Sequence, residues 1–329
     1  MPAPPPLINS SESTGRMKIV TRDYLFARGW KSAAPILLLL PGFGLYLLIA
    51  VGPSLATAVY SFTDATGIRG IAINWLGFEN YDEFLFRGAA SRDNIAALRR
   101  TLIFCFFVTT IQFCLGLLLA VLLNTRLRGR TIFRTIFFMP VILGVAIQGL
   151  IWKLFLLPGG GPVAEMFSWI GWSSEFLGGQ PRQAFAWVIV VQIWANVGIT
   201  MVIFLAGMQT IPESLYEAAR IDGASGWQLF RNVTWPLLTP AVNTNFLLNI
   251  VGSLQAWQLF LVLIGYRPGT QVLGYLVFAE GFGQTSGSVS SAFRQGYAAA
   301  ASIALFMLVL IIALAANAFV SRREKKYLS

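Results

Sequence analysis

The charged residues of this chain are gathered into short clusters, and six long stretches between them contain no Asp, Glu, Lys or Arg. A helix of ~20 residues crosses the ~30 Å hydrocarbon core of a bilayer, and the stretches are close to that length or longer. Hydrophobic residues make up 56% of the sequence and the mean hydropathy is +0.67, which is typical of a protein with several membrane spans. The stretches are Ser32–Thr63, Thr101–Thr125, Thr135–Trp152, Gln183–Pro212, Asn232–Tyr266 and Gln295–Ser321.

The apolar stretches are predicted to form helices. Lipid offers the backbone no hydrogen-bond partners, so each span must pair its own N–H and C=O groups, and the sequence lacks the alternating pattern of a membrane barrel. The third stretch is the shortest, but the Lys153 amine can reach back to the membrane surface, and the apolar run resumes as far as Leu157. We therefore predict an all-α membrane protein whose six transmembrane helices form one domain, residues 32–321.

The distribution of Lys and Arg predicts the orientation of the spans. With the N-terminus inside, the inner segments carry five, four, two and four of these residues, whereas the longer outer segments carry five, one and two. The positive-inside rule then places both termini and the loop 207–240 in the cytoplasm. Residues 1–31 are predicted to be a basic, partly disordered N-terminus, and residues 322–329 a basic tail. Anionic membrane lipid explains the net charge of +10 without any nucleic acid.

The residue types for catalysis or metal binding are missing. The sequence has no histidine and no phosphate-binding Gly-x-x-x-x-Gly-Lys loop. Its two cysteines, Cys105 and Cys114, fall on opposite faces of one helix and cannot pair with each other. We predict no catalytic residue, metal site or cofactor site in this chain, so any ATP and magnesium belong to partner subunits. Lys153 is the only charge inside a predicted span, which argues against an ion-coupled carrier.

The loop 207–240 contains the signals of two short helices. Thr210 and Glu213 have the spacing of a capping box, which predicts a first helix over residues 211–221. Gly223 stands where a helix commonly ends in a left-handed residue.

The second half of the loop begins with another capping box, formed by Ser225 and Gln228, and a short helix is predicted to end near Asn232. Pro236 and Pro240 then mark the return to the membrane. DNA-binding proteins also use two helices around a turn, but residues 213–231 carry three acids against two arginines, and this balance repels DNA.

This loop resembles the cytoplasmic coupling loop of ABC importer permeases, whose pattern is Glu-Ala-Ala, three residues, Gly, nine residues and Ile-x-Leu-Pro. Glu217-Ala218-Ala219, Gly223 and Pro236 match the pattern in register. Val233 replaces the Ile and Trp235 the Leu, and both departures keep an apolar contact.

Other segments are similar to the carbohydrate-uptake permeases of the maltose type. They include Leu205-Ala-Gly-Met-Gln209, Arg220-Ile-Asp-Gly-Ala224 and the run from Arg128 to Pro140. The tail Arg322–Lys326 lacks the Gly-Ala-Val-Lys-Gly ending of the second permease in such pairs, so the chain is identified as the first, maltose-F-like partner. The outer segment Ile264–Gly269 departs from the Thr-Gly-Gly-Gly-Pro run of the family.

The resemblance implies a type I ABC importer permease fold in a bacterial inner membrane. It also implies a second six-span permease subunit, two copies of a cytoplasmic ABC ATPase and an extracytoplasmic solute-binding protein as partners. Transport would proceed by alternating access. The residues expected to couple the chain to the ATPase are Glu217, Ala218, Ala219, Asp222, Gly223 and Pro236.

A solute path is predicted from polar stripes inside the spans. Asn245, Asn249 and Ser253 recur at every fourth position of the fifth span, and Gln192 and Asn196 form a similar pair in the fourth. Amides and hydroxyls with an aromatic neighbour, here Trp257, suit a sugar or related polyol. The alternative is that these side chains make interhelical hydrogen bonds, as amides often do in membranes. Three further amides are isolated and are expected to be structural: Gln112, Gln148 and Asn317.

Three other functions remain open from the sequence. A self-sufficient secondary carrier or channel accounts for six spans but leaves the capped loop unexplained. A membrane anchor for a cytoplasmic enzyme accounts for the loop but leaves the amide stripes without a role. An ABC importer for glycerol phosphate is similar in sequence, but no arginine cluster within the membrane is evident in this half.

Overall fold

The structure is a computed structural model that describes residues 35, 37–125, 128–157, 160–171, 180–282 and 293–328. These residues are almost entirely helical, and the β pairing among them is an isolated antiparallel bridge between Thr63 and Trp75. They separate into two compact units, one ending at Val59 and the other beginning at Tyr60. The N-terminal segment 1–31 lies outside the described residues.

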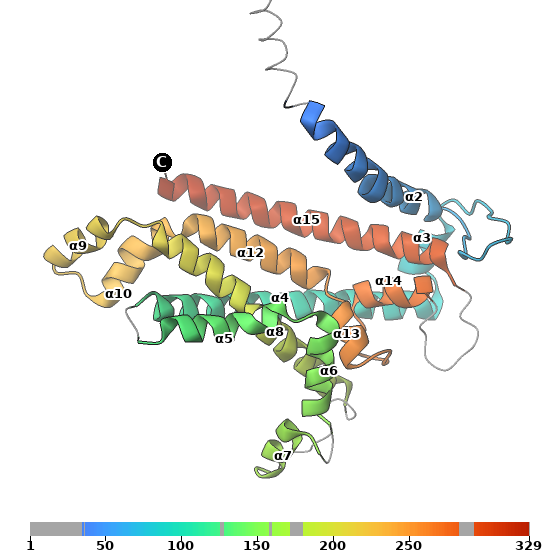
Figure 1. Ribbon diagram of the computed structural model, residues 1–329. Helices are drawn as coiled ribbons and strands as arrows, with labels where there is room; N and C mark the ends of the chain where they lie inside the picture. The colour runs from blue at the N-terminus through green and yellow to red at the C-terminus, as the bar shows by residue number, and fades with distance from the viewer. Residues whose placement is uncertain are drawn as a thin grey trace, which may run out of the picture. The chain divides into compact units, whose positions relative to one another are not determined.

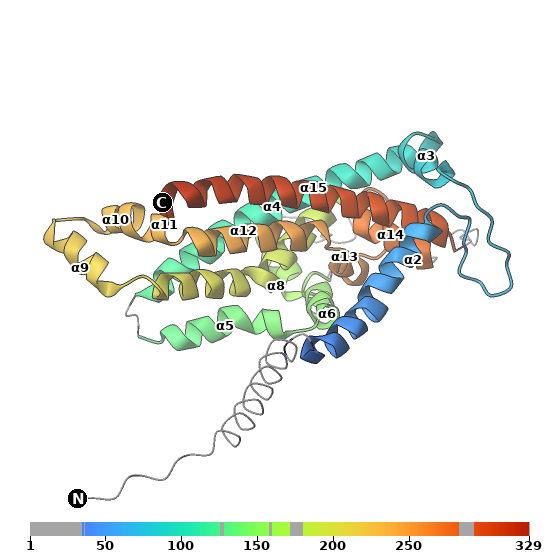
Figure 2. The same ribbon diagram turned by 90° about the horizontal axis from the view of Figure 1, so that it is seen from above.

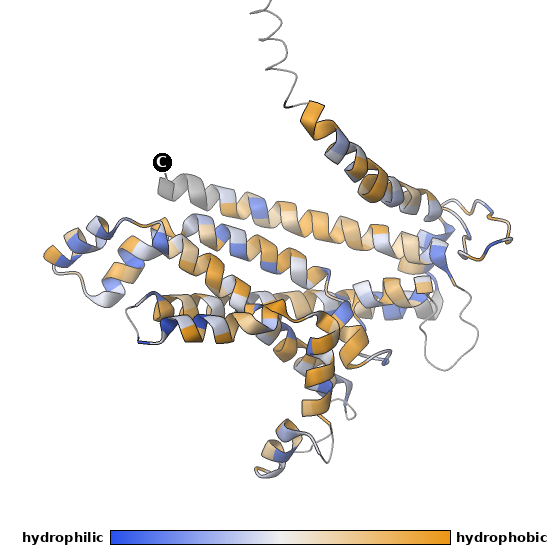
Figure 3. Cartoon of the chain, in the orientation of Figure 1, coloured by the Kyte–Doolittle hydropathy of each residue, from blue (hydrophilic) through white to orange (hydrophobic). Residues whose placement is uncertain are grey.

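The first candidate span runs from Leu37 to Tyr60. It contains a π-helical turn, η1 (Leu47–Val51), followed by α2 (Gly52–Tyr60). The π turn ends two residues before Pro53, whose missing N–H prevents one regular helical hydrogen bond. Figure 3 shows that the helix ending in α2 is strongly apolar at its start and of mixed hydropathy in α2 itself.

Three straight helices of the second unit are long and apolar enough to cross a membrane: α4 (Gly88–Asn124), α8 (Pro181–Gln209) and α15 (Gln295–Leu328). Helix α4 packs along α8, and α12 (Thr239–Leu254) packs against both α4 and α15 (Figures 1 and 2). The backbone of the predicted basic tail continues α15 as far as Leu328.

A fourth apolar segment is sharply bent rather than straight. Helices α5 (Arg130–Ile142) and α6 (Val145–Phe155) meet at 103°. The side-chain amide of Gln148 donates to the carbonyl oxygens of Pro140 at 2.8 Å and Leu143 at 2.9 Å, and so satisfies backbone groups that the bend leaves open. The prediction that Gln148 is structural agrees with this arrangement.

The fifth predicted span, Asn232–Tyr266, overlaps a pair of helical segments that is bent by 69° and begins at Gly226. The first segment is a continuous run of α10 (Gly226–Leu229), the π-helical turn η2 (Phe230–Thr234) and α11 (Trp235–Leu237), and the second is α12. Four candidate spans are therefore straight, and the number rises to six when each bent pair is counted as one span. All six predicted stretches correspond to one of these elements.

Short helices complete the second unit: α3 (Glu79–Leu85), α7 (Pro162–Ser168), α9 (Glu213–Ile221), α13 (Gln258–Leu263) and α14 (Leu273–Phe282). In both views α9 and α10 lie at one end of this unit, and α3 and α14 lie at the other (Figures 1 and 2).

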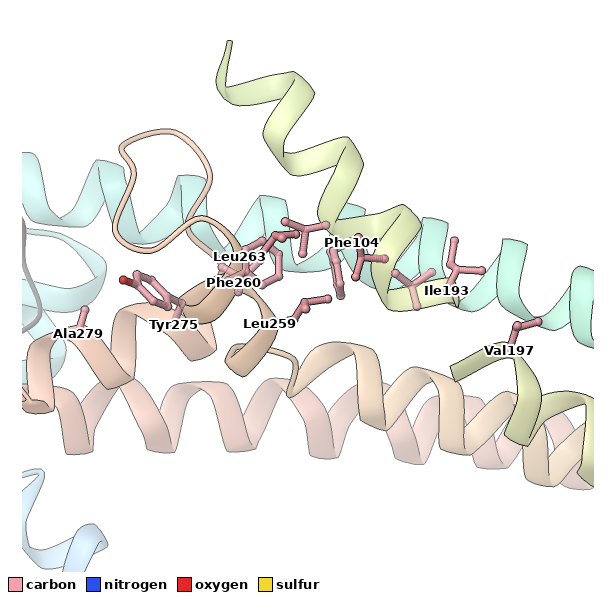
Figure 4. Packing of buried hydrophobic residues seen from close by; sticks show 12 residues of the cluster. Phe104, Ile193, Val197, Leu259, Phe260, Leu263, Tyr275 and Ala279 are labelled. Carbon is pink, nitrogen blue, oxygen red and sulfur yellow. The ribbon is translucent and has the colours of Figure 1, made fainter. Parts of the chain in front are cut away.

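The largest apolar cluster of the second unit joins α4, α8, α13 and α14. Figure 4 shows Phe104 from α4 and Phe260 from α13 facing each other, and their ring centroids are 5.1 Å apart. Both side chains are almost completely buried. This packing fixes α8, which carries Gln192 and Asn196, relative to α4 and α13.

Candidate functional site

The coupling segment, residues 207–240, contains a tight turn after α9. Gly223 has φ of +80°, as predicted from its place after the helix. The Ala224 N–H donates to the Ala219 carbonyl at 2.9 Å, and the Gly223 N–H donates to the Arg220 carbonyl at 3.0 Å, which is the Schellman pattern. A Cβ atom at position 223 would meet nothing within 4 Å, so the positive φ, and not lack of space, favours glycine here.

The first predicted capping box is wrong. Helix α9 begins at Glu213, and its N-cap is Pro212, which makes no side-chain cap bond. Thr210 still has helical backbone angles at the end of α8, and its hydroxyl donates to the Gly207 carbonyl at 2.9 Å. The longer preceding helix thus uses the side chain that the short one was expected to use.

The second capping box is confirmed. The Ser225 hydroxyl accepts from the Gln228 N–H at 3.4 Å, and the Gln228 side-chain oxygen accepts from the Ser225 N–H at 2.7 Å. The predicted end near Asn232 is wrong, because the helix continues through η2 and α11. Pro236 lies inside this continuous run, shortly after the π turn η2, and its missing N–H removes one regular helical hydrogen bond there.

The coupling segment presents apolar side chains on its surface. Ile221 is 86% exposed and Trp227 is 68% exposed. Glu217, in the middle of α9, is also exposed. An exposed apolar patch with a charge beside it is typical of a protein–protein contact.

A cavity of about 200 Å³ lies between α4, α8 and α12. Five of the six residues predicted for the solute path line it, and they come from α8 and α12: Gln192, Asn196, Asn245, Asn249 and Ser253. Trp257 does not line this cavity, because its ring stacks on Phe278 with centroids 4.5 Å apart.

The wall of this amide cavity is a hydrogen-bonded network. The side-chain amide of Gln112 donates to the hydroxyl of Thr200 and to the side-chain oxygen of Asn249, both at 2.9 Å. The Asn245 amide donates to the Thr200 carbonyl at 3.2 Å. The nitrogen of the Asn249 side chain and the oxygen of the Asn245 side chain are buried and have no partner among the described residues. Such unpaired groups cost free energy unless a ligand or water completes them.

The comparison with known families decides what kind of protein carries this site. Residues 112–326 match the family described as the binding-protein-dependent transport system inner membrane component. The chain belongs to this family. The matched region includes α8, α12 and the coupling segment, so the permease region contains both features described above.

Individual relatives agree with this assignment. The permease is 30% identical to the trehalose/maltose transport system permease protein MalF of Thermococcus litoralis, over 72% of this chain and 76% of the relative. It is 27% identical to the probable starch degradation products transport system permease protein AmyD of Thermoanaerobacterium thermosulfurigenes, over 90% and 94%.

A solved structure is also similar over nearly the whole permease. A chain in the crystal structure of a bacterial alginate ABC transporter, in complex with an alginate pentasaccharide-bound periplasmic protein, matches with a TM-score of 0.72 and 25% identity. The match covers 94% of the permease and 98% of that chain. The fold is therefore that of an ABC importer permease.

The sequence indicates that Gln112 is isolated and structural, and the structure shows that it is not isolated but makes interhelical hydrogen bonds. Gln112 lines the amide cavity of the permease and links α4, α8 and α12 through one side chain. Its partners Thr200 and Asn249 are 88 and 137 residues away in the sequence. A local pattern could not reveal these contacts, although an amide in an otherwise apolar span was a signal of a polar partner.

Proposed function

We propose that this permease is one membrane half of an ATP-driven importer that carries a sugar or related polyol across a bacterial inner membrane by alternating access. The observation behind this proposal is that one unit contains both the exposed coupling segment and the amide cavity. The names of the two relatives refer to sugar-transport systems, and the alginate transporter was crystallised with a saccharide-bound periplasmic protein.

The amide cavity has the chemistry that a polyhydroxylated solute requires. A sugar hydroxyl both donates and accepts, and the free nitrogen of Asn249 and free oxygen of Asn245 provide one partner of each kind. Gln192 and Asn196 add polar groups from the opposite wall. The side-chain nitrogen of Asn196 donates to the Gln192 backbone carbonyl at 3.0 Å.

Coupling to ATP hydrolysis is assigned to residues 210–236. In this proposal α9 docks in a cleft of the ATPase, Glu217 forms a charge-assisted contact there, and Gly223 permits the turn. Helices α10 and α11 lead without a break in the chain to α12, which carries Asn245 and Asn249. Movement of the docked segment would therefore displace one wall of the amide cavity.

The proposed partners are a second six-span permease, two ATPase copies that bind ATP and magnesium, and an extracytoplasmic solute-binding protein. The Lys and Arg distribution places both termini and the coupling segment on the cytoplasmic side. Purification in mild detergent tests this assembly. An ATPase and a second permease should co-purify with the chain, whereas a lone homo-oligomer would favour a secondary carrier or channel.

The solute itself is tested on the binding protein. A thermal-shift screen of the solute-binding protein that works with this permease should show stabilisation by a saccharide or polyol. Stabilisation by glycerol phosphate alone would move the proposal to the alternative substrate.

A further inference from the structure

A second and larger cavity, about 470 Å³, lies at the end of α4 and α8 that is farther from the coupling segment. We call it the arginine cavity. Three of its lining residues are cations and none is an acid: Arg99, Arg100, Ile103, Gln180, Pro181, Arg182, Phe185 and Gly269. No local sequence pattern indicates this cluster, because Arg182 is more than eighty positions from Arg99 and Arg100.

Among the described residues no carboxylate makes an ion pair with the three guanidinium groups of this cavity, whereas Arg87 pairs with Asp82 and Arg294 pairs with Glu83. Asp93 attracts the Arg100 guanidinium through space and offsets part of its repulsion from Arg99. The Arg100 guanidinium is held in place by a hydrogen bond of 3.0 Å to the Gln271 carbonyl. Like charges gathered around one space repel each other, so an anion that entered it would relieve this repulsion.

The N-terminal end of α8 adds the positive end of a helix dipole to the cavity. Helix α8 starts at Pro181, which has no N–H, and the Gln183 and Ala184 N–H groups donate to the Gln180 carbonyl, so the contribution is that of the dipole and not of a row of free donors. Guanidinium groups bind carboxylate and phosphate oxygens through paired, charge-assisted hydrogen bonds. The cavity thus combines both of the usual elements of an anion site.

The arginine cavity shares one face of α8 with the amide cavity. Phe185 lines the first, and Gln192, Asn196 and Ile199 line the second. Their spacing of seven, four and three residues keeps them on one helical stripe, and Phe185 lies ~10 Å along the axis from Gln192. Between the cavities the Phe185 ring contacts Phe104 and Phe260, with centroids 6.1 and 6.0 Å apart.

We propose that the arginine cavity is an anion site that binds a carboxylate or phosphate group. The group belongs either to the transported solute or to the headgroup of a membrane lipid. The first source rests on the proposed function and makes the solute acidic; the second does not depend on it.

Binding to purified protein tests the site without any transport measurement. The full-length permease, with the subunits that co-purify, is titrated calorimetrically in an uncharged detergent with inorganic phosphate and with galacturonate, and galactose is the neutral probe. We expect the anions to bind and galactose to bind at least ten-fold more weakly. The triple variant R99Q/R100Q/R182Q should lose at least ten-fold in anion affinity.

Two further variants keep this test decisive. Arg92→Gln removes an exposed charge from the same helix outside the cavity and should bind like the wild type. Arg182→Gln alone changes an exposed residue, so it should fold even if the triple variant does not, and should bind several-fold more weakly.

Native mass spectrometry with added phosphatidylglycerol separates the two sources. The site binds a lipid headgroup if the lipid stays on the wild type, is lost from the triple variant and from Arg182→Gln, and is displaced by phosphate. Soluble anions that bind without any retained lipid identify a solute site. Equal binding of every probe to the wild type, to the triple variant and to Arg182→Gln would overturn the anion site. This result would leave the co-purification test of the proposed function unaffected.

Discussion

The phenol oxygen of Tyr216 lies 3.0 Å from the hydroxyl oxygen of Thr234, and this contact joins the two halves of the coupling segment. The Thr234 hydroxyl also lies within donating distance, 3.4 Å, of the Leu229 carbonyl in the same helical run. Thr234 is buried and Tyr216 is half-buried. Helix α9 is thereby attached to the run of helix that leads to α12.

Tyr216→Phe should loosen α9 from η2. It removes one hydrogen bond worth about 0.5–1.5 kcal/mol, so amide hydrogen exchange in α9 should rise about two- to ten-fold. Hydrogen–deuterium exchange with mass spectrometry measures this. Tyr81→Phe removes a similar bond, to Ser61 at 2.7 Å, and should leave exchange in α9 unchanged. Unchanged exchange in α9 of both variants would show that the Tyr216 contact is not stabilising.

Gly223→Val should release the ATPase from the permease while the spans still insert. A β-branched residue at positive φ costs ~1–2 kcal/mol or more, and no atom of the chain lies within 4 Å to add a clash. Transport and ATPase retention are measured on purified complexes. Gly226→Ala, at an exposed helical position, is the matched control and should retain both. Wild-type transport by Gly223→Val would remove the main support for the coupling role.

Glu217→Lys should weaken ATPase association more than Glu217→Gln does. The side chain is exposed, and the proposed contact with a basic group on the ATPase becomes a repulsion when the charge is reversed. Retention of the ATPase is measured at increasing salt. Because salt screens the repulsion, the two variants should differ less in ATPase retention as the salt concentration rises. Equal retention at low salt would mean that Glu217 faces no charge.

Asn249→Leu should lower solute uptake at least ten-fold while the complex assembles and keeps its basal ATPase activity. It removes a free amide from the cavity and also the acceptor of the Gln112 bond, at a cost of about 1–3 kcal/mol in stability. Thr200→Val is the control, because it breaks hydrogen bonds in the same network but leaves the Asn249 amide in place. If the complex fails to assemble, Asn249 is a packing residue.

The orientation is tested by thiol labelling of intact cells. Gly287→Cys should react with an impermeant reagent, and Ser225→Cys should not, because the Lys and Arg counts place these positions on opposite sides. After lysis the remaining free thiols are labelled with a second reagent. A cysteine that has already reacted in intact cells then shows less of this second label. Labelling of position 225 and protection of position 287 would invert the topology. Gly287 lies outside the described residues.

Local features of the chain were predictable, because their causes are local. The turn at Gly223 and the Ser225 capping box depend on residues within a few positions, and both are as predicted. Thr210 was assigned to the wrong helix because two helices compete for its hydroxyl and the sequence does not show which one wins. The break between α5 and α6 had a signal in Pro140 and Gly144, but its 103° angle results from packing.

The two cavities show what the sequence could not provide. The stripe of Asn245 and Asn249 follows from helical periodicity, and these residues do line the amide cavity. Gln112 reaches its partners in the amide cavity only when α4 packs along α8. The same packing brings together the three arginines of the second cavity. Contacts between distant spans depend on which faces meet, and a charge or amide count within one span does not contain that information.

The π-helical turn η2 determines how the side chains before it and after it are rotated relative to each other about the helix axis. A π turn contains about one residue more than an α turn, and one residue corresponds to ~100° of rotation about a helix axis. If the same residues, Phe230–Thr234, were wound as α-helix, the side chains beyond η2 would therefore be turned by about a quarter of a circle relative to those before it. A docked α10 would then present α12 with its amides facing away from the cavity. The alignment of the ATPase-facing surface with the solute-facing surface is thus set by one residue of backbone.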